Sequence, residues 1–257
     1  MNLNRLGNAL ILILWITPAP LAMAWPQSDN SDFSKAAEAY RQGRFDEALT
    51  GYSKLLEKYP HNPELLYNTA NTYYRKQDIG QAILYYEKAK VNNPRDLDIQ
   101  YNLKFVNSQL EYSVKDTRNW YLRALEYVLN LVTHSEVMLL ALALYFFFVL
   151  AWVFVLYFRP DHPWGWIRKT LLISFLCSFV LVGLKGVQAY MIRDAVVVSK
   201  EAEVRFGPSS TDQVAFRLGE GLKVYVVDHH SDWSRILLAN SDTGWVKNSE
   251  IAEVLQS

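Results

Sequence analysis

The pattern of hydrophobic and polar positions divides the 257-residue chain into four parts. A short apolar stretch is followed by a long segment whose apolar residues recur three and four positions apart, as on one face of a helix. Two long and nearly charge-free runs come next. The end of the chain alternates β-branched with polar residues, as half-buried strands do. The pattern therefore predicts a helical domain, two membrane helices and a small β domain, in that order.

The first part has the pattern of an export signal. An apolar core over residues 9–16 follows Arg5, and Ala22-Met23-Ala24 forms a small-residue cleavage site. We expect a signal peptide over residues 1–24, cleaved after Ala24. An uncleaved anchor helix is the alternative.

The two apolar runs are each long enough to cross a bilayer. Residues 137–158 contain no charge, and at ~1.5 Å per residue they span a hydrocarbon core of about 30 Å. The second run contains Lys185, whose side chain we expect to reach the headgroups, although a functional charge inside the membrane is the alternative. The loop between the runs holds Arg159 and Arg168 against one acid, which places it in the cytoplasm. Both flanking domains then face outward.

The helical segment repeats with a period of 34 residues. Ala48 and Ala82 are one period apart, and so are Tyr52 and Tyr86. Residues 67–94 resemble the tetratricopeptide repeat, in which small residues let two helices approach closely. A third unit begins at Leu97 and lacks a second helix, so we expect a capping helix there.

By this resemblance, the first helix of each repeat lines a concave groove that binds partner proteins. Asparagine amides can hold a peptide backbone, and arginine can hold a carboxylate. The alternative is that the tyrosines pack between repeats and the asparagines cap or solvate helices. The predicted groove residues are Tyr40, Arg41, Tyr67, Asn68, Asn71, Tyr74, Arg75, Tyr101, Asn102 and Phe105.

Residues 114–134 connect the repeats to the membrane as an amphipathic segment. Trp120, Tyr121, Leu125 and Val128 can share one helical face, and Trp and Tyr suit a membrane–water interface. The two readings are a helix on the outer membrane surface and an extra helix packed against the repeats.

The β-rich tail resembles a bacterial SH3-like domain. Its strand runs are separated by glycine-containing turns, and about 60 residues with this spacing predict a five-stranded barrel. Trp233 and Trp245 are candidates for an exposed ligand surface, although one of them is expected in the core. His229 and His230 lie in an expected loop that we interpret as solvated rather than metal-binding.

Composition excludes several other functions. The net charge is zero, so no basic surface for nucleic acid is indicated. Cys177 is the only cysteine and we expect it to pack as a small apolar residue; an intrachain disulfide is excluded. The chain lacks the zincin, P-loop and nucleophile-elbow motifs. We therefore expect a protein that is not an enzyme and that needs no cofactor or metal.

The order of the segments resembles BatE, the tetratricopeptide family of bacterial aerotolerance operons. The expected segments are a signal peptide (1–24), repeats with a capping helix (31–113), an amphipathic connector (114–134), transmembrane helices (136–158 and 169–192) around a cytoplasmic loop (159–168), and an SH3-like domain (195–257). The resemblance implies a bacterial inner-membrane protein with two spans and both domains in the periplasm. It also implies von Willebrand factor A-type membrane proteins and a MoxR-type AAA+ ATPase as partners.

Two functional hypotheses follow from these observations. The first is a scaffold or chaperone-like assembly protein that docks partner proteins on the periplasmic side, in an aerotolerance or envelope-stress complex. The alternative is an envelope-anchoring module whose SH3-like domain binds peptidoglycan or its peptides.

Overall fold

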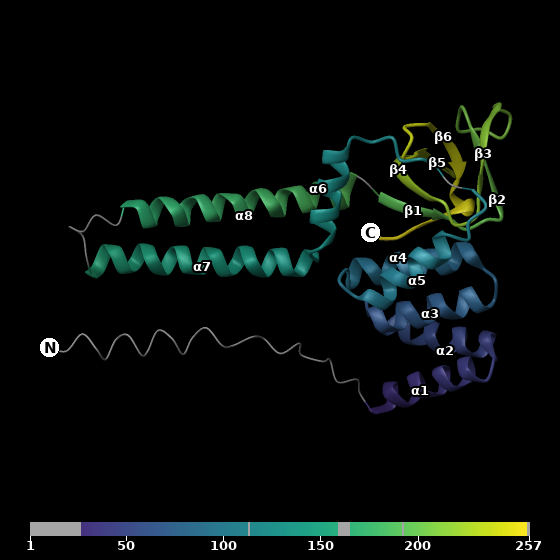
Figure 1. Ribbon diagram of the computed structural model, residues 1–257, viewed down its shortest axis with the longest axis horizontal. Helices are drawn as coiled ribbons and strands as arrows, with labels where there is room; N and C mark the ends of the chain where they lie inside the picture. Colours follow the sequence, from purple (N-terminus) through teal and green to yellow (C-terminus); the bar gives the residue numbers. More distant parts are fainter. Residues whose placement is uncertain (1–26, 113, 159–164, 192, 256–257) are drawn as a thin grey trace.

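The computed structural model describes residues 27–112, 114–158, 165–191 and 193–255. It has three parts: a stack of helices, a β domain beside the stack, and a long pair of helices that projects away from both (Figure 1). The expected signal peptide lies outside the described residues, as does most of the expected cytoplasmic loop.

The repeat region is built from antiparallel helix pairs, each packed on the next. Ala48 and Ala82 are fully buried, and a β-carbon at Gly51 would lie 2.7 Å from Ala36 Cβ, so the small residues set how closely the helices approach. Tyr52 and Tyr86 are buried as wedges. The helices are α1 (Gln27–Arg41), α2 (Phe45–Lys58), α3 (Pro63–Arg75), α4 (Ile79–Asn92) and α5 (Leu97–Asn107).

The turns inside the two pairs use the same left-handed backbone conformation. Gly43 has a φ of 77° and Gln77, one repeat later, has a φ of 62°. Glycine adopts this conformation freely, whereas glutamine does so rarely. Asp78 caps the following helix, α4, and its side chain accepts a hydrogen bond from the Gln81 N–H.

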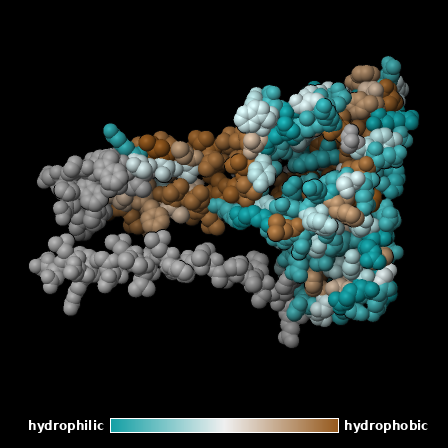
Figure 2. Space-filling view, in the orientation of Figure 1, coloured by the Kyte–Doolittle hydropathy of each residue, from teal (hydrophilic) through white to brown (hydrophobic). Residues whose placement is uncertain are grey.

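The projecting pair consists of α7 (His134–Phe158) and α8 (Gly165–Met191), preceded by the short helix α6 (Trp120–Asn130). Phe148 of α7 and Phe175 of α8 stack with ring centroids 5.7 Å apart, so the two helices pack along each other. Figure 2 shows that hydrophobic residues gather on this projection, whereas the body is mainly hydrophilic.

Only one helix in the described part of the chain is long and apolar enough to cross a membrane, over Ser135–Val153. Two spans were expected, but the apolar stretch of α8 covers only Leu172–Leu184. Polar and small residues on both sides shorten it. Cys177 is exposed on α8, and the Lys185 side chain is not among those described.

The β domain is one antiparallel sheet of seven strands in the order β3-β2-β6-β5-β4-β1-β7. The expected number of five was wrong, because residues 198–200 and the 3-10 turn Asn248–Glu250 each interrupt a β-rich run. One core takes residues from strands at both ends of this order, including Leu218 and Ile251, so the sheet curls around it. The strands are β1 (Arg193–Val197), β2 (Glu201–Arg205), β3 (Val214–Gly219), β4 (Lys223–His230), β5 (Trp233–Leu237), β6 (Thr243–Lys247) and β7 (Ile251–Glu253).

The β domain packs directly on the end of the helical stack. Val196 and Val254 belong to the same buried cluster as Ile83 and Leu103 of the repeats. The last hydrophobic face of the stack is therefore covered jointly by α5 and by the β domain, and not by a capping helix alone.

Candidate partner-binding surfaces

The predicted groove residues lie on the first helix of each repeat, on α1, α3 and α5. Arg75 contacts two aromatic rings on this surface. Its guanidinium carbon lies 5.9 Å from the ring centroid of Tyr40 and 5.3 Å from that of Phe45, distances at which a cation is attracted to a ring face. Arg75 is exposed, and none of the ion pairs among the described residues involves it. Phe45 was missed in the sequence, where it starts the second helix directly after the turn at Gly43.

A second cluster joins the repeats internally. Asn102 Nδ2 donates to the Tyr67 hydroxyl at 2.7 Å and lies 3.5 Å from Asn71 Oδ1. The Tyr86 hydroxyl also donates to Asn71 Oδ1, and burial raises the pKa of Tyr86 above its ordinary value. These amides hold neighbouring helices together, so part of their hydrogen-bonding capacity is already used within the repeats.

The remaining predicted groove residues differ in whether their side chains already make contacts within the repeats. The Asn68 amide donates to the Glu64 carbonyl of its own helix at 2.9 Å, and Arg41 pairs with Glu38. Tyr74 packs edge-on against Phe105, with centroids 6.1 Å apart. Tyr101 is 70% exposed. The accessible part of the predicted groove surface is therefore aromatic, with Arg75 as its unpaired cation among the described contacts.

The two candidate tryptophans of the β domain lie on its outer face. In the β5–β6 pairing Trp233 faces Lys247 and Arg235 faces Trp245, so all four side chains point to the same side of the sheet. Trp233 is only 8% exposed, and the Lys247 ammonium lies 5.9 Å from its ring centroid. Trp245 is half-buried. This part of the outer face is therefore aromatic and carries two cations, with Asp228 opposite Arg235 on β4.

The histidine pair lies on a strand and not in the expected loop. His229 and His230 end β4, and the turn that follows is only two residues long. His229 Nδ1 lies 3.0 Å from the Ser234 hydroxyl, and Nε2 lies 3.1 Å from Glu253 Oε1. Among the described residues no cluster of three or more metal-ligating side chains occurs.

A turn of the β domain docks on the start of α4. The Gly80 N–H donates to Glu220 Oε1 at 2.8 Å, so a carboxylate from the other domain satisfies a free donor at a helix N-terminus. Gly221, with a φ of 84°, lies so close that a β-carbon there would be 2.7 Å from Ile83 Cδ1. The glycines that mark this turn in the sequence thus serve the contact between domains.

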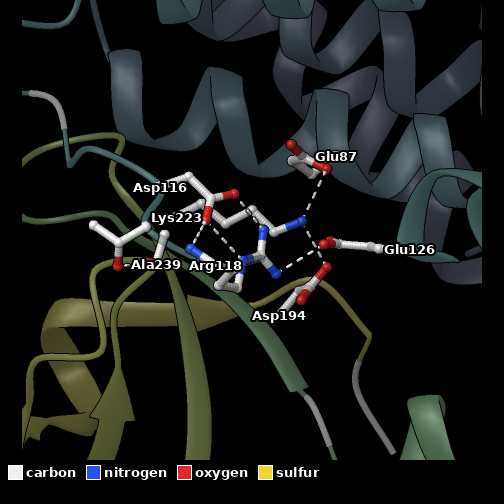
Figure 3. Close-up of polar contacts among 8 residues, drawn as sticks. Glu87, Asp116, Arg118, Glu126, Asp194, Lys223 and Ala239 are labelled. Carbon is white, nitrogen blue, oxygen red and sulfur yellow. Dashed lines mark hydrogen bonds and ion pairs between the residues drawn. The ribbon is translucent and has the colours of Figure 1, made fainter. Parts of the chain in front are cut away.

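Charged residues join the two domains beside this turn (Figure 3). Lys223 Nζ lies 2.7 Å from Asp194 Oδ2 and 3.8 Å from Glu87 Oε2 of α4. Burial acts to raise the pKa of Glu87, but Lys223 and Lys90 outweigh it and hold that pKa below its usual value. Burial raises the pKa of Asp194 despite Lys223. The two carboxylates raise the pKa of Lys223 against the effect of its own burial.

A second ion pair network lies within the connector, and its arginine also contacts the β domain. Arg118 binds Asp116 and Glu126, each at 2.8 Å, and its guanidinium lies 5.4 Å from the Tyr225 ring centroid. The hydrogen bonds from Arg118 lower the pKa of Asp116 to about 2. No sequence signal could reveal the network around Lys223, because Glu87 and Asp194 are both far from Lys223 in the chain.

Comparison with known families agrees with this two-module architecture. The Tetratricopeptide repeat model matches residues 29–96 and the Bacterial SH3 domain model matches residues 198–253. No curated protein matches the chain. Strand β1, which packs on the repeats, lies outside the SH3 match. The chain thus carries a tetratricopeptide repeat region followed by a C-terminal all-β bacterial SH3 domain, two modules that typically bind other molecules without catalysis.

Proposed function

We propose that this protein is a non-enzymatic membrane-anchored scaffold that docks partner proteins on the outer side of a bacterial inner membrane. The observation that carries the proposal is the exposed Arg75 stacked on Tyr40 and Phe45 in the groove. A cation held over two rings has its position fixed while its outward N–H groups remain free to bind a carboxylate. The groove therefore suits a partner segment with acidic and apolar side chains.

The contact between the two modules supports a topology with two spans. The repeats precede α7 and the SH3 domain follows α8, yet they share a buried cluster. Two domains in contact lie on the same side of a membrane, so the chain between them crosses an even number of times. Because α8 packs along α7, it is the return crossing if α7 spans.

The basic loop between the spans supports a periplasmic location of both domains. Reporter fusions at residues 115 and 257 should be active only with a periplasmic reporter, and a fusion at residue 163 only with a cytoplasmic one. Opposite sides for the two domains would contradict the topology.

The resemblance to the BatE family supports specific partners. We propose von Willebrand factor A-type membrane proteins, acting with a MoxR-type AAA+ ATPase in aerotolerance or envelope stress. Arg75→Glu should abolish their co-purification with the full chain, because it reverses the charge that would bind the partner.

The matched control is Lys54→Glu, which makes the same charge change on an exposed residue of α2, the second helix of its repeat. Asn68 and Asn102 are poor probes because both already hydrogen-bond within the repeats. Equal partner recovery with both variants would show that the groove is not the docking surface.

A second function is favoured by the outer face of the SH3 domain. Arg235 and Lys247 are exposed there beside Trp245, and neither has an ion pair among the described contacts. This face suits peptidoglycan peptides, which carry carboxylates. Detergent-solubilised protein should sediment with cell-wall sacculi, and Arg235→Glu with Lys247→Glu should release it while Arg75→Glu does not. Retention of the SH3 variant on sacculi would exclude this face.

A further inference from the structure

The connector helix α6 presents an apolar face that no described part of the chain covers. Trp120 is 75% exposed, Tyr121 53%, Leu125 48% and Val128 58%. In an α-helix these four positions share one broad side, because Leu125 lies about one turn after Tyr121 and Val128 lies about two turns after Trp120. The opposite side carries Glu126, which pairs with Arg118 against the SH3 domain. The helix is therefore held from its polar side, with its apolar side free.

The corner between α6 and α7 is fixed by hydrogen bonds. The Thr133 N–H donates to Glu136 Oε2 at 2.9 Å, and the Glu136 N–H donates to Thr133 Oγ1 at 3.2 Å. This reciprocal pair is a capping box, which sets the start of α7. Arg95, at the start of α5, also pairs with Glu136 and donates to the Leu131 carbonyl at 3.5 Å. The repeats thus brace the corner.

The direction of α6 follows from this corner. Figure 1 shows α6 lying crosswise to α7 and α8, at the end of the projection where it joins the body. The apolar window of α7 begins at Ser135, and α6 ends at Asn130. Even if the link between them were fully extended, at roughly 3.3–3.6 Å per residue, it would keep α6 close to the level where α7 enters the hydrocarbon.

We propose that α6 lies in the plane of the membrane surface, with Trp120, Tyr121, Leu125 and Val128 embedded among the lipid headgroups and upper acyl chains. Tryptophan and tyrosine favour this layer because their rings are apolar at one end and polar at the other. The occupant is lipid rather than a second protein because the same helix leads directly into the span. This inference rests on the membrane topology proposed above, in which the embedded helix and the spans together hold the body in one orientation, so the predicted groove has a fixed height and direction above the bilayer.

Site-directed spin labelling tests this placement in the full chain. Cys177→Ser removes the only cysteine, and single cysteines are then introduced at Leu125 or Val128 on the apolar face and at Arg123 on the polar rim. The matched water-exposed control is Thr211 in the β2–β3 loop. Each labelled protein is reconstituted into nanodiscs of phosphatidylcholine and phosphatidylglycerol. Collision rates with molecular oxygen and with a water-soluble nickel chelate are then measured.

We expect labels at Leu125 and Val128 to collide several-fold more with oxygen than with the nickel chelate, relative to Thr211. A label at Arg123 should give an intermediate ratio. Nickel accessibility at Leu125 and Val128 equal to that at Thr211 would show a water-facing helix. Low collision rates with both reagents would show a protein cover, from a second copy or another chain. Either result would overturn the proposal, and unchanged circular dichroism confirms that each variant is folded.

Discussion

Gly80→Ala should weaken the contact between the repeats and the β domain, although alanine is the better residue for helix α4. Gly80 lies in the first turn of α4, and alanine stabilises a helix by about 0.8–1 kcal/mol relative to glycine. A β-carbon there would lie 2.8 Å from the Val197 carbonyl oxygen, 2.9 Å from Val198 Cα and 2.9 Å from Glu220 Cγ. Two of these atoms are backbone and cannot move without shifting β1.

The size of the effect follows from two opposing contributions. Overpacking costs about 1–3 kcal/mol, and loss of the hydrogen bond from Gly80 to the Glu220 carboxylate costs about 1.5–3 kcal/mol. Together they exceed the gain in helix propensity. We therefore expect a net destabilisation of roughly 1.5–5 kcal/mol, which lowers the melting temperature by about 2–4 °C per kcal/mol in a domain pair of this size.

Hydrogen exchange locates the effect. Amides of β1 and β7 should exchange faster in Gly80→Ala, because these strands rest on α4. The control is Gly186→Ala in α8, where a new β-carbon meets nothing within 4 Å, so the melting temperature should not fall. An unchanged or higher melting temperature for Gly80→Ala, with unchanged exchange in β1 and β7, would refute the close contact.

Three further outcomes are expected. Lys223→Ala should destabilise the protein by about 3–5 kcal/mol in thermal unfolding, because it leaves Glu87 and Asp194 without their shared cation; Asp194→Asn should cost less, because burial already disfavours the charge of Asp194. The pKa of Lys223 is raised in the folded state, so the charged lysine stabilises the fold fully below its unfolded-state pKa of about 10.4, and this contribution is lost as the pH rises further. Between pH 7 and strongly alkaline pH, the free energy of unfolding should therefore fall more for the wild type than for Lys223→Met, which has no amine to titrate. Ala82→Trp should unfold the repeats, because Ala82 is fully buried between helices and overpacking costs about 1–3 kcal/mol or more; unchanged far-UV circular dichroism would contradict this.

The sequence predicts the local features of the fold, because these features depend on contacts between residues that are close together in the chain. The 34-residue spacing of Ala48 and Ala82 reflects contacts between adjacent helices, and the left-handed turn at Gln77 corresponds to Gly43 one period earlier. Strand number was less accessible. The break between β1 and β2 and the 3-10 turn before β7 are each only three residues long, and pairing in three dimensions decides whether such a short interruption separates two strands.

The contact between modules was not accessible from the sequence. Val196, Lys223 and Glu220 read as ordinary positions of a small β domain, and their partners on α4 are more than a hundred residues away. For the predicted groove, the sequence pattern selected the residues but could not show their hydrogen bonds. Asn71 and Asn102 bind within the repeats, so their availability to a partner depends on geometry that spacing does not contain.

The shared face of the repeats and the SH3 domain has a consequence for biogenesis. Ile83 emerges from the ribosome about 170 residues before Val254, which lies in the same buried cluster. At a synthesis rate of roughly 5–20 residues per second, the β domain that covers this face of the repeats is completed on the order of 10–30 s after the repeats. On the topology proposed above, α7 and α8 insert into the membrane during that interval, while an apolar surface of the repeats stays exposed. Nascent chains would then bind holding chaperones on the side of the membrane where the repeats lie, and a chain truncated before β1 would keep that surface exposed for its lifetime.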